Sequence, residues 1–253
     1  MTDWHLMHLG HMAISGSGLV MTEAVYPEAV GRNGPGCVGL YSDACEVSLT
    51  RVLEFCRKNS PASFGIQLGH AGRKASIQPP WQNRAPIPLD GGGWGSVAPS
   101  AISMGSPYPP PRALTVEDLN SVRDRFVEAT RRAARIGYDL LEIHAAHGYL
   151  FHQFLSPLSN HRDDDYGGNP DNRRRFLLEV FTAMRDVWPG DRPMGLRLSA
   201  VDWAEDGVEI DDTVRVAQDL KGRGCDFIVT SSGGLVVDKP IPVGPGYQVP
   251  FAE

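Results

Sequence analysis

Short apolar segments alternate with helical patterns along this chain. Helical spacing of apolar residues occurs at 3–15, from Ser42 to before Pro61, at 115–136, at 170–187 and from Asp211. The apolar runs that predict strands lie at 19–24, 64–68, 140–143, 194–198 and 227–229. Strands that alternate with helices form parallel βαβ units. The pattern therefore predicts an α/β fold, either a doubly wound sheet or a (β/α)₈ barrel.

The glycine pattern favours the barrel over the doubly wound sheet. Gly16-Ser17-Gly18 begins a G-x-G motif, but Met21 stands at the third glycine position and the motif precedes its strand. A closed barrel needs eight strands, and only five can be placed in the 253 residues. We therefore expect one domain over 1–253, an incomplete TIM barrel of about five to six βα units.

One long connection interrupts the alternation between residues 69 and 113. It is rich in proline and shows no sustained period of either kind. A connection of this length usually has a function, often as a lid over a site, or is disordered. Trp81, Trp94 and Tyr108 favour an ordered lid.

Charge and composition exclude several classes of partner. Twenty-four Lys and Arg against 30 Asp and Glu give a net charge of −6, which provides no basic surface for nucleic acid or an anionic membrane. No apolar run reaches the length of a membrane span, and the N-terminus lacks a signal-peptide pattern. Four cysteines without a C-x-x-C pair predict free thiols in a reducing cytoplasm.

The third predicted strand carries the strongest chemical signal. His144, His147 and Tyr149 follow one another within six residues at its carboxyl end, where active sites of parallel α/β folds lie. Small residues, Ala145 and Ala146, separate them. Two imidazoles and a phenol at one strand end can hold a carbonyl or enolate oxygen and deliver a proton.

Other strands add polar groups. Gln67 lies at the end of the second predicted strand and Ala24 at the end of the first. Arg197 lies inside the fourth, between Leu196 and Leu198, and a cation there needs an anionic or electron-rich partner. That partner is either Glu142 on the adjacent strand, in a structural ion pair, or a ligand.

Structural interpretations of these groups stay open at this point. His144 and His147, in an H-x-x-H spacing with His152, His161 and Asp163 nearby, could be metal ligands, although the spacing is not a standard zinc pattern. They could also be satisfied structural histidines. The segment from Ser231 to Gly234 could form an anion-binding nest or a turn. We predict no metal site.

Several long motifs resemble the old yellow enzyme family of flavin-dependent ene-reductases, and within it the bacterial NADH:flavin oxidoreductase branch. They are Gly65 to Lys74 (GIQLGHAGRK), Glu142 to Pro157 (EIHAAHGYLFHQFLSP), Asp165-Tyr166-Gly167-Gly168 with Asn172-Arg173, and Pro245 to Glu253. The resemblance covers nearly the whole chain. It implies a (β/α)₈ barrel that binds FMN at its carboxyl face.

The resemblance also implies roles for individual residues. Gln67 would hydrogen-bond the pyrimidine edge of the flavin, Arg197 would lie near N1 and the C2 carbonyl, and Ala24 would touch the ring through its backbone. His144 and His147 would bind the oxygen of the substrate's activating group, and Tyr149 would donate the proton. The implied reaction is ping-pong. NADPH or NADH reduces FMN, and the hydride then passes to an enone or quinone-like small molecule.

The same resemblance implies that strands are missing. The family's first strand precedes Met1, and its last two follow Glu253, so we expect an internal fragment that binds FMN weakly and is poorly soluble or dependent on association. A homo-oligomer is compatible with the sequence. Two alternatives remain, the barrel part of a 2,4-dienoyl-CoA reductase-like iron–sulfur flavoenzyme and a non-catalytic truncated remnant.

Overall fold

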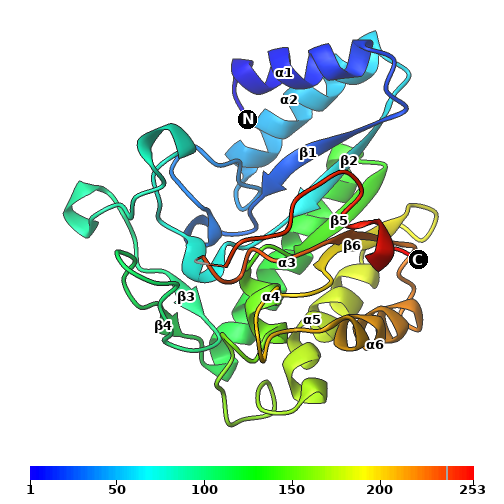
Figure 1. The fold of residues 1–253 in the computed structure, drawn as a ribbon. Helices are drawn as coiled ribbons and strands as arrows, with labels where there is room; N and C mark the ends of the chain where they lie inside the picture. Colours follow the sequence, from blue (N-terminus) through cyan, green and yellow to red (C-terminus); the bar gives the residue numbers. More distant parts are fainter. Residues whose placement is uncertain (238) are drawn as a thin grey trace.

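Five parallel strands form one sheet in the computed structural model, which describes residues 1–237 and 239–253 (Figure 1). The strands are β1 (Leu19–Val25), β2 (Ser63–Leu68), β5 (Leu140–Ala145), β6 (Met194–Ser199) and β7 (Phe227–Ser231), paired in that spatial order. Every neighbouring pair is parallel. Chain order and spatial order agree, so each crossover leads to the next strand, as in successive units of a barrel wall.

One helix precedes β1, and the other helices lie in the crossovers between the strands. They are α1 (Asp3–Ile14), α2 (Asp43–Asn59), α3 (Val116–Ile136), α4 (Leu150–Leu155), α5 (Pro170–Arg185) and α6 (Ile210–Lys221). The ends of α3 show how the sequence sets these boundaries. Thr115 and Asp118 form a reciprocal capping box at its start, and Gly137, with φ of 97°, ends it in the left-handed conformation. No helix in the described part of the chain is long and apolar enough to cross a membrane.

The core lies between the helices and one face of the sheet. Side chains alternate between the faces of a strand, and one face presents Ile66, Leu141, Ile143 and Leu196, all fully buried. These pack in one cluster with apolar residues of the helices, among them Phe126, Phe176 and Phe181. The opposite face carries the polar residues of the same strands and is free to form a site.

The structure corrects several sequence-based boundaries. The third predicted strand extends to Ala145, so His144 lies within β5 rather than after it. The last strand extends to Ser231. Asp211 lies in the first turn of α6, which has Glu209 as its N-cap. The six-residue helix α4 was not predicted, because nearly all its side chains are buried and it has no amphipathic stripe.

The long connection 69–113 is ordered. It contains the 3₁₀ turns Gly72–Lys74, Pro80–Gln82 and Leu89–Gly91, and the two-residue strands β3 (Val97–Ala98) and β4 (Arg112–Ala113) form a separate small sheet. Trp94 Nε1 donates to the carbonyl of Val30, and the Tyr108 hydroxyl donates to the carbonyl of Arg84. Trp81, in contrast, is 82% exposed, so its side chain does not anchor this segment.

Candidate active site

The polar face of the sheet brings the predicted site residues together. Strand register makes Ala24, Gln67 and Glu142 successive neighbours across β1, β2 and β5. It also makes His144 and Arg197 partners across β5 and β6. Because all but Glu142 lie in the carboxyl halves of parallel strands, these side chains meet toward one end of the sheet.

Gln67 is oriented by Glu142. Its Nε2 donates to Glu142 Oε1 at 2.5 Å, and both side chains are buried. Burial raises the pKa of Glu142, against the opposing effects of the Gln67 hydrogen bond and the Arg197 charge. The structural ion pair between Glu142 and Arg197, left open by the sequence, is not formed among the described residues. Glu142 therefore acts on Gln67 instead.

Arg197 retains unused hydrogen-bonding capacity. Its Nε is buried and has no hydrogen-bond partner in the described part of the chain. A buried N–H without an acceptor is costly, and an acceptor supplied by a ligand would satisfy it. The residues present fit a flavin ring at this point, because its electron-rich N1 and C2 carbonyl region needs a cation and a donor of this kind.

His144 and His147 form a hydrogen-bonded pair whose tautomers follow from their partners. The backbone N–H of Ala146 donates to His144 Nδ1, so the His144 proton lies on Nε2. That nitrogen lies 3.3 Å from His147 Nδ1, which must accept. His147 Nε2 then carries its proton toward the hydroxyl of Ser231, 2.7 Å away. Three residues thus form one directional chain of donors.

Both imidazoles are neutral at pH 7. Burial is the main cause, and it lowers the pKa of His144 to about 3 and that of His147 to about 4. The charge on Arg197 contributes to both of these shifts. Each ring therefore keeps one N–H for a substrate oxygen and carries no charge.

Tyr149 stacks on His144 and hydrogen-bonds to Asn33. The two rings lie 4.3 Å apart between centroids and 19° from parallel. The Tyr149 hydroxyl donates to Asn33 Oδ1, which also accepts from the hydroxyl of Tyr26. Burial raises the pKa of Tyr149, so the phenol is protonated at pH 7.

The turn between His147 and Tyr149 has an unusual backbone. His147 has φ of 55° and Gly148 has φ of 70°. A Cβ on Gly148 would lie 2.5 Å from the carbonyl oxygen of Gly234, so no larger residue fits. Lys74 Nζ donates to the carbonyls of both His147 and Gly234. This turn places the side chains of His147 and Tyr149, two of the candidate catalytic residues, on one short segment.

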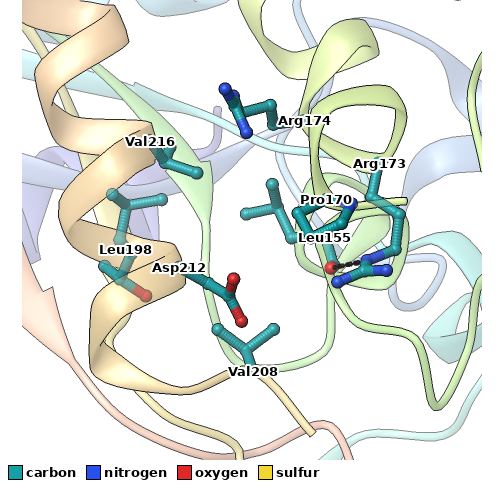
Figure 2. Close-up of a pocket in the computed structure, with 9 residues that line it drawn as sticks. Leu155, Pro170, Arg173, Arg174, Leu198, Val208, Asp212 and Val216 are labelled. Carbon is teal, nitrogen blue, oxygen red and sulfur yellow. Dashed lines mark hydrogen bonds between the residues drawn. The ribbon is translucent and has the colours of Figure 1, made fainter.

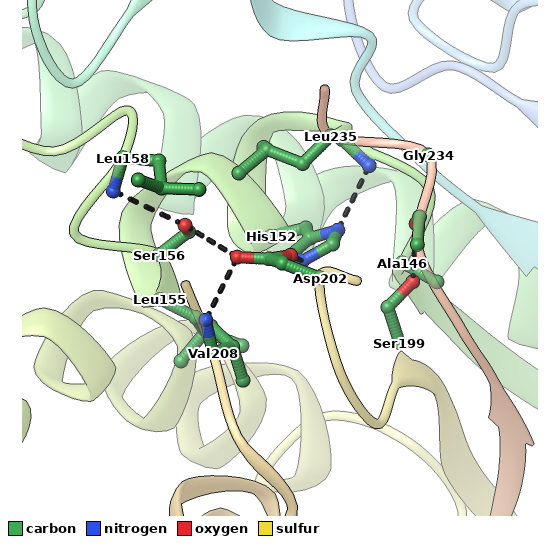
Figure 3. A network of polar contacts seen from close by, with 12 residues as sticks. Ala146, His152, Leu155, Ser156, Leu158, Ser199, Asp202, Val208, Gly234 and Leu235 are labelled. Carbon is green, nitrogen blue, oxygen red and sulfur yellow. Dashed lines mark hydrogen bonds and ion pairs between the residues drawn. The ribbon is translucent and has the colours of Figure 1, made fainter. Parts of the chain in front are cut away.

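A buried network supports the turn from α4 (Figure 3). The Gly148 N–H donates to His152 Nδ1, which places the His152 proton on Nε2, 2.7 Å from Asp202 Oδ1. Ser156 Oγ and the Val208 N–H both donate to Asp202 Oδ2. Burial tends to raise the pKa of Asp202, but these hydrogen bonds outweigh it and the pKa lies below its usual value.

Two other candidate sites have less structural support. No group of three or more His, Cys, Asp or Glu side chains that could hold a metal ion occurs among residues 1–237 and 239–253. A small pocket lies between α5 and α6, bordered by Leu198, Val208, Asp212 and Val216 (Figure 2). Its free volume of about 20 Å³ suits roughly one water molecule. It also opens on the face of β6 opposite Arg197.

Several residues of this site were not assigned a role from the sequence. Tyr26 and Asn33 lie in the first loop, which has no periodic pattern, and Asp202 follows β6 at a distance of 50 residues from His152. Only Ser231 had a signal, as part of the Ser-Ser-Gly-Gly segment. The structure uses its hydroxyl as an acceptor for His147.

Comparisons with known proteins show the family of this chain. Residues 1–250 match the model of the NADH:flavin oxidoreductase / NADH oxidase family. The chain is 43% identical to an NADH:flavin oxidoreductase from Gibberella zeae, over 100% of this chain and 65% of that protein. It is 42% identical to an NADPH dehydrogenase from Geobacillus sp., over 99% of this chain and 68% of that one. The chain thus spans about two thirds of the length of these relatives.

The fold is also similar to that of a solved structure. The structure of the old yellow enzyme homologue from Zymomonas mobilis superposes with a TM-score of 0.78 and 26% identity, covering 94% of this chain and 68% of that one. This likeness confirms the resemblance and the barrel class that the sequence predicted, with five strands of that barrel in the described residues.

Proposed function

Since this chain belongs to the NADH:flavin oxidoreductase / NADH oxidase family, we propose that it binds FMN and serves hydride transfer from NADPH or NADH to the activated C=C bond of an α,β-unsaturated carbonyl compound. The family and the names of its relatives support the flavin and the nicotinamide donor. The arrangement of His144, His147 and Tyr149 supports the acceptor class. The observation that carries most weight is the buried Arg197 Nε beside this donor group, which has no hydrogen-bond partner among the residues that the structure describes.

Three residues would hold the flavin ring. Gln67, fixed by Glu142, offers its amide to the pyrimidine edge. Arg197 supplies a positive charge and its free Nε–H, and Ala24 offers its backbone from the neighbouring position on β1. When bound, FMN supplies the chemistry of accepting a hydride from the nicotinamide and passing it on.

The protein's own residues would bind and protonate the substrate. A substrate oxygen can accept from His147 Nε2 as this N–H turns from Ser231, and from His144 Nε2 as this N–H turns from His147 Nδ1. Two neutral N–H donors can polarise a substrate carbonyl without repelling a nearby positive charge. They can also bind a phenolate oxygen. The Tyr149 hydroxyl, stacked above His144, is then placed to protonate the α-carbon.

We also propose that the segment 69–113 covers one side of this site. Its first residues contact the catalytic turn, through the Lys74 hydrogen bond to the carbonyl of His147. Arg73 extends the contact by donating to the carbonyls of Ile102 and Leu235. A covered site would exclude water from the reacting centre.

The first test concerns the flavin. We expect the 253-residue chain to bind FMN, and we expect anaerobic NADPH to bleach the visible flavin band and an enone to restore it. Arg197→Met should raise the Kd for FMN about ten- to hundredfold, because it removes a charge-assisted hydrogen bond. Arg215→Met, at an exposed position on α6, is the control. Equal FMN affinity in the two variants, measured by fluorescence quenching, would contradict the assignment of Arg197.

The second test concerns the histidine pair. Replacing both His144 and His147 with alanine should weaken binding of a phenol to the FMN-loaded chain about a hundredfold, since two hydrogen bonds to a charged oxygen are lost. Flavin reduction by NADPH should change much less. The charge-transfer band of the phenol complex gives the affinity, and His161→Ala, at an exposed histidine, is the control. An unchanged affinity in the double variant would show that the pair is structural.

The same variant has a pH signature in stability. The folded-state pKa values of His144 and His147 lie below the usual value of about 6.5. Between about pH 6.5 and pH 4 the unfolded chain therefore binds more protons than the folded chain, and stability falls as the pH falls. Urea unfolding across this range should show a shallower loss of stability in the double alanine variant.

A further inference from the structure

Two buried phenols share one acceptor at the site. The hydroxyls of Tyr26 and Tyr149 both donate to Oδ1 of Asn33. Tyr26 is 2% exposed, comes directly after β1 and takes no part in the functions derived above. A second phenol placed within hydrogen-bond reach of a proton donor needs an explanation.

The orientation of the Asn33 amide is determined by its other partners. Its Nδ2 donates to the carbonyl of Lys74 at 3.0 Å, so Oδ1 must face the two phenols. The Asn33 carbonyl accepts from the N–H of Ile77 at 2.7 Å. Asn33 is therefore held on its backbone and its side chain by the segment that follows β2.

Tyr26 is held just as firmly. Its N–H donates to the carbonyl of Val38 and its carbonyl accepts from the N–H of Leu40, both at 2.9 Å. Its ring lies in the small cluster with Ala71 and Ala75. Its hydroxyl therefore cannot move far from Asn33 or from the oxygen of Tyr149.

We propose that Tyr26 is a positioning residue for the proton donor Tyr149, and that its hydroxyl turns from Asn33 to Tyr149 when Tyr149 gives up its proton. This rests on the function proposed above. The Tyr149 O–H bond breaks and a C–H bond forms at the substrate α-carbon, and the electron pair of the O–H bond stays on the phenolate oxygen. The hydride for the β-carbon comes from the proposed flavin chemistry, and solvent water returns the proton to Tyr149.

The charge balance around Tyr149 makes such a partner necessary. Burial disfavours the phenolate of Tyr149, and the thiol of Cys37 disfavours it further when ionised. A hydrogen bond from Tyr26 and the charge of Arg84 favour it. Burial is the main cause that raises the pKa of Tyr26 itself, and the charge of Glu23 acts in the same direction. Tyr26 therefore stays protonated and able to donate while Tyr149 is ionised.

The kinetic test uses two acceptors with the FMN-loaded chain. Tyr26→Phe should slow reoxidation by an enone about ten- to hundredfold, the value of one hydrogen bond to a charged group. Reoxidation by a quinone, which needs no carbon protonation, should change little. Tyr166→Phe removes a hydroxyl bonded to Glu179 far from this pair and is the control. Equal losses with both acceptors would overturn the proposal.

A double-variant cycle tests whether the three residues act together. Asn33→Ala should give a loss with the enone similar to that of Tyr26→Phe, because the hydroxyls lose their common acceptor. The combined variant should be no slower than either single variant. Losses that multiply would show two independent roles and would overturn the proposal.

A measurement without turnover separates this inference from the proposed function. Tyrosines labelled with ¹³C at Cζ give one resonance each, and the Tyr149 resonance is the one missing in Tyr149→Phe. In Tyr26→Phe its ionisation should move to higher pH relative to the unmodified chain and to Tyr166→Phe. An unmoved midpoint would refute the role of Tyr26, even if the chain reduces no enone. A loss of enone reduction in Tyr149→Phe with none in Tyr26→Phe would refute this inference alone.

Discussion

Replacement of Asp202 by alanine is expected to lower the free energy of unfolding by about 3–5 kcal/mol, because three buried donors would lose their acceptor at a cost of about 1–3 kcal/mol each. The Asp202 side chain is fully buried and accepts from His152, Ser156 and the N–H of Val208. Alanine would leave these three donors buried without an acceptor. The measurement is urea-induced unfolding near pH 7.

The control for this prediction is Asp124→Ala. Asp124 pairs with Arg123 on the surface of α3, and its side chain is 69% exposed, so its loss should cost at most about 1 kcal/mol. The two variants should also differ in pH dependence. The pKa of Asp202 lies below its unfolded value of about 3.9, so its contribution is present above that pH and disappears as the pH falls through the folded-state pKa. A loss in Asp202→Ala no larger than in the control would show that the network is dispensable.

Replacement of Tyr149 by phenylalanine is expected to slow reoxidation of the reduced flavin by an enone about 10²- to 10⁴-fold, the usual contribution of a positioned general acid. The phenylalanine ring keeps the stacking on His144, so substrate binding should persist. Reoxidation by a quinone and reduction by NADPH should keep their rates. Stopped-flow absorbance measures each half-reaction separately.

The matched variant for this prediction is Tyr108→Phe. Tyr108 also donates its hydroxyl to one oxygen, the carbonyl of Arg84, but it lies in the connection 69–113. Tyr108→Phe should leave the rates of reoxidation by the enone and by the quinone unchanged. If Tyr149→Phe slows the quinone as much as the enone, Tyr149 shapes the site and does not supply the proton.

The alternation of strands and helices was predictable because each element has its own period. Every strand of the main sheet was found within two residues of its predicted ends, since apolar side chains must face the helices at every second position. The exception among the helices, α4, is buried on nearly all sides and lacks any period. Strands β3 and β4 are only two residues long, too short to give a pattern.

The site was predictable where chemistry follows directly after a strand. His144, His147, Gln67 and Arg197 lie at the carboxyl ends that the parallel fold brings together. Their roles toward flavin and substrate remain predictions. The supporting contacts were not predictable, because they come from loops far apart in sequence. The Tyr149 bond to Asn33 spans 116 residues, and no local pattern marks such a pair.

The left-handed turn at His147 and Gly148 bears on the timing of folding. It is completed by Lys74, whose ammonium reaches carbonyls 73 and 160 positions away along the chain. Contacts of that separation close large loops and form late. We therefore expect the βα units to assemble before Lys74 forms its hydrogen bonds to this turn. Ligands that bind at the turn would stabilise interactions absent from the folding transition state. They should slow unfolding and leave the rate of folding almost unchanged.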